Sequence, residues 1–175
     1  MIMSVFRILF VFLLLFSCTS QKEKQVNIDW NKKKSVELNK VIAAEEAIDI
    51  KLYLQRHLDW KMIATGSGLQ YYIYEHGEGD SLKEGDIVDI KYLVKTFDDT
   101  ICYQTASDEV LEIKIDHSQV ETGLQEGLKK MCVGDKAKMI IPSHLAHGLT
   151  GDFNKIPPLT PILIDVQVVE LLNRN

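Results

Sequence analysis

The sequence predicts an α+β domain in which an antiparallel β-sheet curls over one short α-helix, with an amphipathic helix in front of it. Apolar residues recur at helical spacing in one long stretch near the N-terminus and in one short stretch of the interior. Five other stretches alternate apolar and polar residues or are rich in aromatic and β-branched residues, which is typical of strands. Several strands and a single short interior helix together indicate the α+β class.

The composition limits the function classes that fit the chain. Of 175 residues, 46% are hydrophobic and 26% are charged, which suits one globular domain with additional segments. The formal net charge is −5, and no long basic run interrupts the sequence. This mildly acidic balance argues against binding to nucleic acid and against electrostatic docking on anionic lipid.

The first eighteen residues have the features of an export signal. Arg7 precedes an apolar core over 8–16. That core is too short to span a bilayer, which takes about 20 apolar residues, and has the length of a signal-peptide core. Leu15-Phe16-Ser17-Cys18 follows and resembles the lipobox of bacterial lipoproteins, in which the cysteine becomes the lipidated first residue. Phe16 departs from the usual small residue, so an ordinary secreted protein cleaved near Cys18 is the alternative.

The chain is therefore expected to divide into four parts. A lipoprotein signal peptide covers 1–17, and a polar, lysine-rich tether covers 18–34. A helical segment follows over 35–64, and the α+β domain occupies 65–175. We expect the mature protein to be lipid-anchored through Cys18 in the cell envelope, facing the periplasm.

The helical segment carries an apolar stripe. Val41, Ile42, Ile48 and Leu52 recur near a spacing of 3.6 residues, and neither glycine nor proline interrupts the stretch 35–57. Such a stripe must pack on another surface. Two partners stay open: the domain that follows, or a second copy of the same helix in a homodimer.

Strand signals dominate the domain that follows. The predicted strands are Leu69–Tyr74, Val88–Val94, Leu111–Ile115, Ala137–Ile141 and Ile162–Val168. Between the third and fourth of them, Thr122-Gly123-Leu124-Gln125 has the Thr-x-x-Gln form of a capping box. It opens a short helix with Leu124 and Leu128 on one face.

No pattern in the sequence supports covalent or metal chemistry. His144 and His147 stand three apart, but no Cys, Asp or Glu at a fitting spacing joins them. The chain has no glycine-rich phosphate loop and no serine in a nucleophile elbow. A solvated turn explains Asp98-Asp99 better than a catalytic dyad. We expect no cofactor and no metal.

Several short segments carry a resemblance to a known family. They are Gly85-Asp86 with Val88–Tyr92, then Val120–Leu128, Met131–Lys138, Ile141-Pro142, Ala146–Gly148, Ile156–Pro158 and Ile164–Val166. Their order over about ninety residues resembles the FK506-binding (FKBP) type of peptidyl-prolyl cis-trans isomerase. Thr65–Tyr71 is similar to the lead-in of exported bacterial members. A lipobox, a helix and one such domain look most like the gliding-motility-associated isomerase lipoproteins of the Bacteroidetes.

The resemblance implies an activity that needs no nucleophile and no cofactor. Rotation about an X–Pro bond faces a barrier of about 18–20 kcal/mol. An apolar, aromatic cup lowers it by favouring the twisted imide over the planar ground states, while a few donors hold the peptide. The expected partners are proline-containing segments of exported proteins. The alternative is a non-catalytic chaperone or scaffold that binds such segments.

The family pocket, carried over residue by residue, is expected to place eight residues at the catalytic site. They are Tyr92, Tyr103, Val120, Glu121, Leu124, His147, Ile156 and Ile164, with Cys102 and Leu111 as further pocket lining. Glu121 falls where a backbone N–H holds the peptide. Leu124 replaces a tryptophan, and His147 replaces a tyrosine donor. Leu111 and Ile164 replace phenylalanines, and plain core packing explains these leucines and Ile164 equally well. We therefore expect weak activity.

The mapping also separates the two remaining cysteines. With Cys18 in the anchor, an even pair remains, but parity does not show that the two lie close enough for a disulfide. By the resemblance, Cys102 faces the cleft and is partly accessible, whereas Cys132 ends the interior helix and is buried. Two free thiols are expected.

Overall fold

The computed structural model describes residues 32–173. The chain divides into two units, Met1–Ser35 and Val36–Asn175, and the second contains the whole sheet and the interior helix. The predicted signal peptide, Cys18 and nearly all of the predicted tether lie outside the described residues. Within 32–173, no helix has both the length and the apolar character that crossing a membrane requires.

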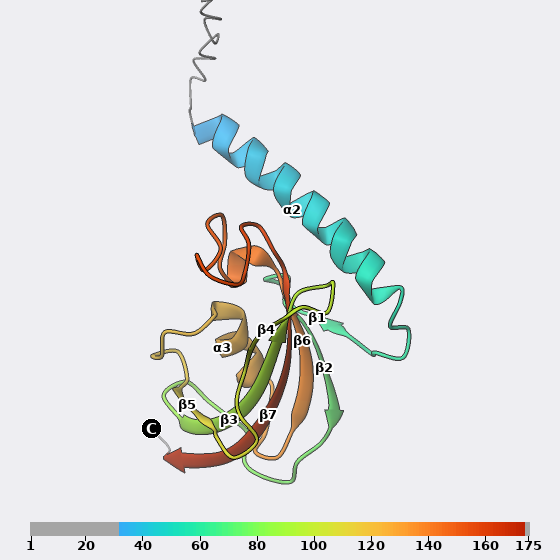
Figure 1. Cartoon of the computed structure of the whole chain (residues 1–175). Helices are drawn as coiled ribbons and strands as arrows, with labels where there is room; N and C mark the ends of the chain where they lie inside the picture. Colours follow the sequence, from blue (N-terminus) through green and yellow to red (C-terminus); the bar gives the residue numbers. More distant parts are fainter. Residues whose placement is uncertain (1–31, 174–175) are drawn as a thin grey trace, which may run out of the picture. The chain divides into compact units, whose positions relative to one another are not determined.

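A seven-stranded antiparallel sheet forms the body of the domain (Figure 1). Its strands follow the order β1-β2-β6-β7-β3-β4, and β5 pairs with β3 beside this path. The strands are β1 (Ile63–Ala64), β2 (Gln70–Glu75), β3 (Ile87–Lys95), β4 (Ile101–Gln104), β5 (Leu111–Lys114), β6 (Lys136–Ile141) and β7 (Ile162–Asn173). All five predicted strands are present. The sequence does not predict β1 or β4, because β1 has only two residues and the four residues of β4, Ile101–Gln104, do not alternate between apolar and polar.

The interior helix α3 (Thr122–Leu128) lies against β6 and completes the predicted fold class (Figure 1). Two glycines permit its close approach to the strand. A Cβ on Gly123 would stand 2.4 Å from Ile141 Cγ2, and one on Gly127 would stand 2.3 Å from Met139 Sδ. Because the helix packs this closely, its N-terminus has a defined position over the sheet.

The predicted capping box is wrong. Glu121, rather than Thr122, is the N-cap residue, and no side chain caps the helix. Gln125 instead binds the loop before the helix: its Oε1 accepts the Asp116 N–H at 2.8 Å, and its Nε2 donates to the Ser118 carbonyl at 2.9 Å. The buried amide therefore holds the loop that leads into α3.

The N-terminal helix is present as α2 (Lys32–Leu54), and its second half packs on the sheet. Ile50 and Tyr53 form a hydrophobic cluster with Ile140 of β6 and Leu163 of β7. The neighbours of Ile140 and Leu163 along each strand belong to the main core, on the side of α3. Since successive residues of a strand point to opposite faces, α2 and α3 lie on opposite faces of these two strands.

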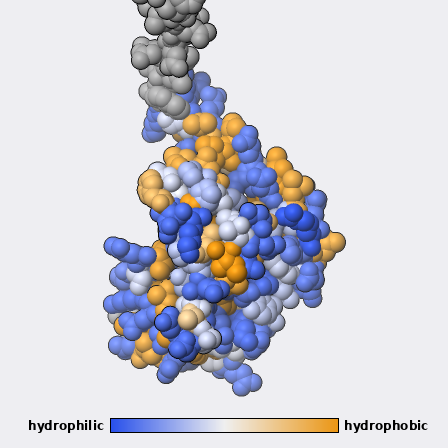
Figure 2. All heavy atoms as spheres, in the orientation of Figure 1, coloured by the Kyte–Doolittle hydropathy of each residue, from blue (hydrophilic) through white to orange (hydrophobic). Residues whose placement is uncertain are grey.

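The docked face of α2 differs from the predicted apolar stripe. Val41, Ile48 and Leu52 are 54%, 58% and 54% exposed, and of the predicted four only Ile42 is partly buried. Figure 2 shows hydrophobic side chains exposed over the part of the surface that α2 forms. The helix carries apolar residues on two neighbouring faces, and periodicity alone does not decide which of them the domain covers.

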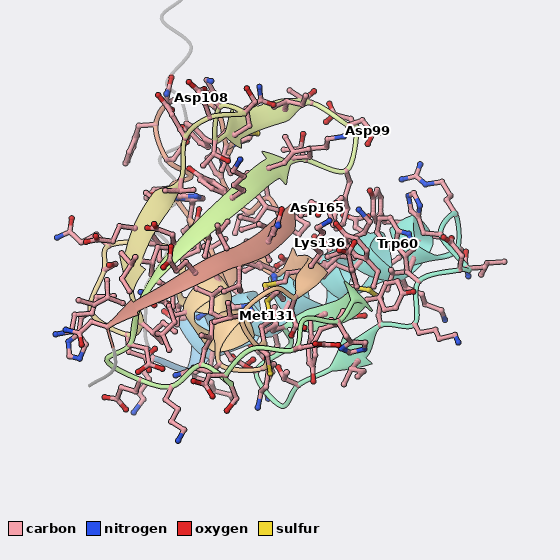
Figure 3. All side chains as sticks on the ribbon, turned by 90° about the horizontal axis from the view of Figure 1, so that it is seen from below. Trp60, Asp99, Asp108, Met131, Lys136 and Asp165 are labelled. Carbon is pink, nitrogen blue, oxygen red and sulfur yellow. The ribbon has the colours of Figure 1, made fainter. Side chains whose placement is uncertain are left out.

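A cluster of polar and aromatic side chains holds the segment between α2 and β1 against the face of the sheet that carries α2. Lys138 Nζ contacts the Asp165 carboxylate and lies 5.2 Å from the ring centroids of both Trp60 and Tyr74. The Tyr74 hydroxyl donates to Asp165 Oδ1 at 2.8 Å. Figure 3 labels Asp165 on β7 and Trp60 in the segment between α2 and β1.

Candidate functional site

A cleft of about 430 Å³ opens where β3, β4, the start of α3 and the loop after the 3₁₀ helix η1 (Ser143–Leu145) meet. Its lining residues are Tyr92, Tyr103, Gln119, Val120, Glu121, Thr122, Ala146 and His147. Four segments far apart in the sequence therefore contribute to one hollow.

The structure brings five of the eight residues predicted as catalytic to this cleft. They are Tyr92, Tyr103, Val120, Glu121 and His147. The other three are Leu124, Ile156 and Ile164, which are fully buried in the main core cluster. Leu111 is half-buried and packs against the same cluster.

The expected accessibility of the two cysteines is wrong. Cys102 is buried in the main core, and Cys132 is half-buried. Since neighbouring residues of a strand face opposite sides, Cys102 points into the core from β4 while Tyr103 lines the cleft. Both cysteines are free thiols, as expected. Burial raises the pKa of the Cys102 thiol, and the nearby Asp152 carboxylate adds to this effect.

Asp152 is a cleft-side carboxylate that the sequence analysis missed. It accepts a hydrogen bond from the Tyr103 hydroxyl, and its Oδ1 accepts the backbone N–H groups of Asn154, Lys155 and Ile156 at 2.8–2.9 Å. Partial burial acts to raise the pKa of this carboxyl, but the hydrogen bonds outweigh it and hold the pKa well below its ordinary value. The run Gly151-Asp152-Phe153-Asn154 has the composition of an Asx turn, which was the available signal.

The Tyr103 hydroxyl is committed to this carboxylate. The hydrogen bond to Asp152 raises the pKa of Tyr103, so the phenol stays protonated and remains a donor. Lys155 also contacts this part of β4. Its Nζ donates to the Cys102 carbonyl at 2.8 Å and lies 5.0 Å from the Tyr103 ring centroid. The loop after η1 is thereby attached to β4 beside the cleft.

Tyr92 offers a donor to a ligand. Its backbone N–H donates to Thr105 Oγ1 at 3.1 Å, which holds the residue on β3. Burial raises the pKa of its hydroxyl, and the charge of Glu121 raises it further. Within residues 32–173, no protein group accepts a hydrogen bond from this hydroxyl. It is therefore available to a molecule bound in the cleft.

A carboxylate and an imidazole are paired in the lining of the cleft. His147 Nε2 lies 3.2 Å from Glu121 Oε1, and both side chains are partly buried. Together with the two phenols they make the lining more polar than the apolar aromatic cup that the sequence analysis expects. Such a hollow can bind an extended peptide through one aromatic face, one aliphatic side chain and several polar groups.

The two loop histidines have partners other than a metal. His144 Nε2 lies 3.0 Å from the Ser67 carbonyl, and His147 pairs with Glu121. In the part of the chain that the structure describes, no three His, Cys, Asp or Glu side chains come close enough together to hold a metal ion.

Residues 79–169 match the family model described as FKBP-type peptidyl-prolyl cis-trans isomerase. The chain is similar to the peptidyl-prolyl cis-trans isomerase FKBP11 of Bos taurus, with 36% identity over 91 residues that cover 52% of this chain and 45% of the relative. It is also similar to the FKBP-type isomerase FkpA of Buchnera aphidicola, with 30% identity over 135 residues that cover 75% of this chain and 54% of the relative.

Among solved structures, the crystal structure of FkpA from Escherichia coli superposes with a TM-score of 0.64 at 29% identity. The match covers 79% of this chain and 65% of that chain. The chain spans about half the length of the curated relatives it matches.

The contact between Tyr103 and Asp152 predicts a linked change of pKa. In Tyr103→Phe, the Asp152 carboxyl loses one of the hydrogen bonds that lower its pKa, so the pKa should rise toward the ordinary value of 3.8. Carboxyl chemical shifts followed by NMR during an acid titration of the full chain measure it. Tyr74→Phe is the matched control, because its phenol binds Asp165 instead.

The same titration tests the loop. A carboxyl with a lowered pKa stabilises the fold at pH values above 3.8, and this contribution disappears only as the pH falls through the lower pKa of the folded state. The N–H groups of Asn154, Lys155 and Ile156 should therefore stay protected from hydrogen exchange at pH 4. A wild-type Asp152 pKa at or above 3.8 would contradict the assignment.

Proposed function

The chain belongs to the family of FKBP-type peptidyl-prolyl cis-trans isomerases, and we propose that it catalyses the rotation of X–Pro peptide bonds in the cleft lined by Tyr92 and His147. The observation that supports this most directly is Tyr92. It presents a ring and an unengaged hydroxyl to the hollow, beside the aliphatic Val120. The cleft needs no covalent step for this reaction.

The mechanism follows from the chemistry of the imide bond. Twisting the bond removes its resonance and makes the carbonyl less polar, so a partly apolar site favours the twisted form over either planar form. The Tyr92 ring and Val120 exclude water from one side of the bound proline. The Tyr92 hydroxyl and the Glu121 backbone N–H hold the flanking carbonyls, which fixes the peptide while the bond rotates.

The polar lining favours weak activity. The Tyr103 hydroxyl is occupied by Asp152, and His147 is occupied by Glu121, so two polar groups of the cleft already have partners. Leu124 and Ile164 contribute no aromatic face to the opening, because both are buried in the core. The same observation supports the second candidate function, a non-catalytic module that binds proline-containing segments as a chaperone or scaffold.

Two substitutions separate these functions. Tyr92→Phe keeps the ring and removes the hydroxyl, so kcat/KM should fall by about tenfold if one hydrogen bond of the transition state is lost. His147→Tyr restores the family's donor and should raise kcat/KM by a similar factor. Proline isomerisation in a short peptide, followed with the full chain, measures both. His76→Tyr is the control, because His76 lies on an exposed turn away from the cleft.

Three results would decide against the proposal in different ways. A wild-type rate as high as that of a strongly active family member would contradict the weak-activity proposal. An inert wild type that still binds the peptide would favour the binding module. An inert chain that binds no proline peptide would exclude both functions for this cleft.

We propose further that the protein acts in the cell envelope, anchored by lipid on Cys18 and facing the periplasm. The lipobox-like run Leu15-Phe16-Ser17-Cys18 supports this location, and the relatives named FkpA are compatible with it. Its clients would be proline-containing segments of exported proteins. The order of lipobox, helix and single domain also supports a role in gliding motility of the kind served by Bacteroidetes isomerase lipoproteins. Loss of surface spreading after deletion of the gene tests that role.

The anchor has a direct test. Cys18→Ser should release the protein from the membrane fraction or leave its signal uncleaved, because stable anchoring needs the acyl chains. Cell fractionation with a mass measurement of the mature N-terminus shows either result. Cys132→Ser is the control, since it changes a cysteine within the domain. Unchanged fractionation together with normal processing of Cys18→Ser would exclude lipidation.

A homodimer through α2 is the remaining proposal about partners. Leu38, Val41, Ile48 and Leu52 are exposed and follow the three-and-four spacing of a coiled-coil seam, interrupted once by Glu45. A second copy of the helix could cover this seam. Ile48→Lys should then shift the full chain from dimer to monomer in sedimentation equilibrium. A wild-type monomer at micromolar concentration would rule the dimer out.

A further inference from the structure

Glu46 is a buried carboxylate on a helix that is otherwise mostly exposed. Its side chain is 7% exposed, at the point where α2 passes the turn η1. Glutamate is rarely buried without a partner, because a carboxylate loses its hydration on burial. Both partners of Glu46 belong to one residue: the Ser143 backbone N–H donates to Oε1, and the Ser143 hydroxyl donates to Oε2 at 2.8 Å.

Ser143 is the first residue of η1 and organises the turn that follows it. Its own carbonyl accepts the N–H of Ala146 at 3.0 Å and the N–H of Gly148 at 2.7 Å. The N–H at the start of a helical turn has no partner inside the turn. Glu46 supplies that partner as a charged acceptor, and hydrogen bonds of this kind are stronger than neutral ones.

The turn closed by Ser143 carries two of the cleft residues. The Gly148 N–H donates to the Ser143 carbonyl and closes the turn. Ala146 and His147 lie within this turn, and both line the cleft. His147 then meets Glu121 at the start of α3. A contact made by α2 therefore reaches the cleft through a short chain of hydrogen bonds, although none of the residues that line the cleft belongs to α2.

We propose that Glu46 is a positioning residue for the cleft: through Ser143 it holds the turn 143–148 so that His147 and Ala146 keep their places in the lining. This role rests on the proposed isomerase function of the same cleft. Glu46 lies outside residues 79–169, the segment that matches the family model. The activity of this protein therefore depends on a helix that the family domain alone does not contain.

The test compares four variants of the full chain. Glu46→Ala removes both acceptors and should lower kcat/KM for proline isomerisation by about tenfold or more, since small displacements of a site residue have effects of this size. Glu46→Gln keeps an acceptor for the Ser143 N–H and should retain most of the activity. Ser143→Ala removes only the hydroxyl contact and should fall between them. Glu37→Ala, at an exposed position of the same helix outside the apolar seam, should match the wild type.

Hydrogen exchange separates positioning from general loss of stability. In Glu46→Ala the amides of Ser143 and Gly148 should exchange faster, while those of β6 and β7 keep their wild-type rates. Wild-type activity and wild-type exchange in a folded Glu46→Ala would overturn the inference. If Glu46→Ala does not fold, equal activity of Glu46→Gln, Ser143→Ala and wild type would overturn it as well.

The exchange measurement also keeps the two proposals apart. If the wild-type chain is inert, the proposed function fails. Faster exchange at Ser143 and Gly148 in Glu46→Ala would then still show that Glu46 holds the turn, and unchanged exchange would show that it does not.

Discussion

The alternation of side chains along β6 and β7 is the constraint on which both layers around the sheet depend. On β6, Met139 and Ile141 belong to the main core on the side of α3, while Ile140 between them packs with α2. Leu163 does the same on β7. Because a strand points successive side chains to opposite faces, the same two strands hold the interior helix on one side and α2 on the other. A one-residue shift of register would exchange the two faces and separate each set of apolar side chains from the helix on its side of the sheet.

The cleft is a consequence of that arrangement. Close packing of Gly123 on Ile141 sets the start of α3, and the Gln125 amide holds the loop in front of it. Residues 119–122, which lie between that loop and Gly123, then line the cleft. On the opposite wall, the Tyr103 hydroxyl and Asp152 join β4 to the loop after η1. The walls are thus held by hydrogen bonds between segments, and the apolar side chains of the lining pack against the main core.

The chemistry of the lining differs from a purely aromatic cup. Two carboxylates stand beside it, and each is paired with a donor, Tyr103 with Asp152 and His147 with Glu121. Paired groups are less available to a bound peptide. Of the two tyrosines that line the described cleft, Tyr92 is the one whose hydroxyl is free. Glu46 adds a third carboxylate that acts at a distance, through a backbone turn. Polar contacts between elements thereby help to shape the cleft.

The sequence alone predicted the fold class, the strands β2, β3, β5, β6 and β7, the helix α3 and the family, because periodicity and short ordered motifs are local properties. It also predicted five residues that share the cleft. The fold sets which face of α2 is covered, since the helix has two apolar faces and the sheet covers one of them. It also decided that Cys102 points inward and that Asp152 and Glu46 find Tyr103 and Ser143. These pairs lie 49 and 97 residues apart in the sequence, and folding alone brings such distant groups within hydrogen-bonding distance.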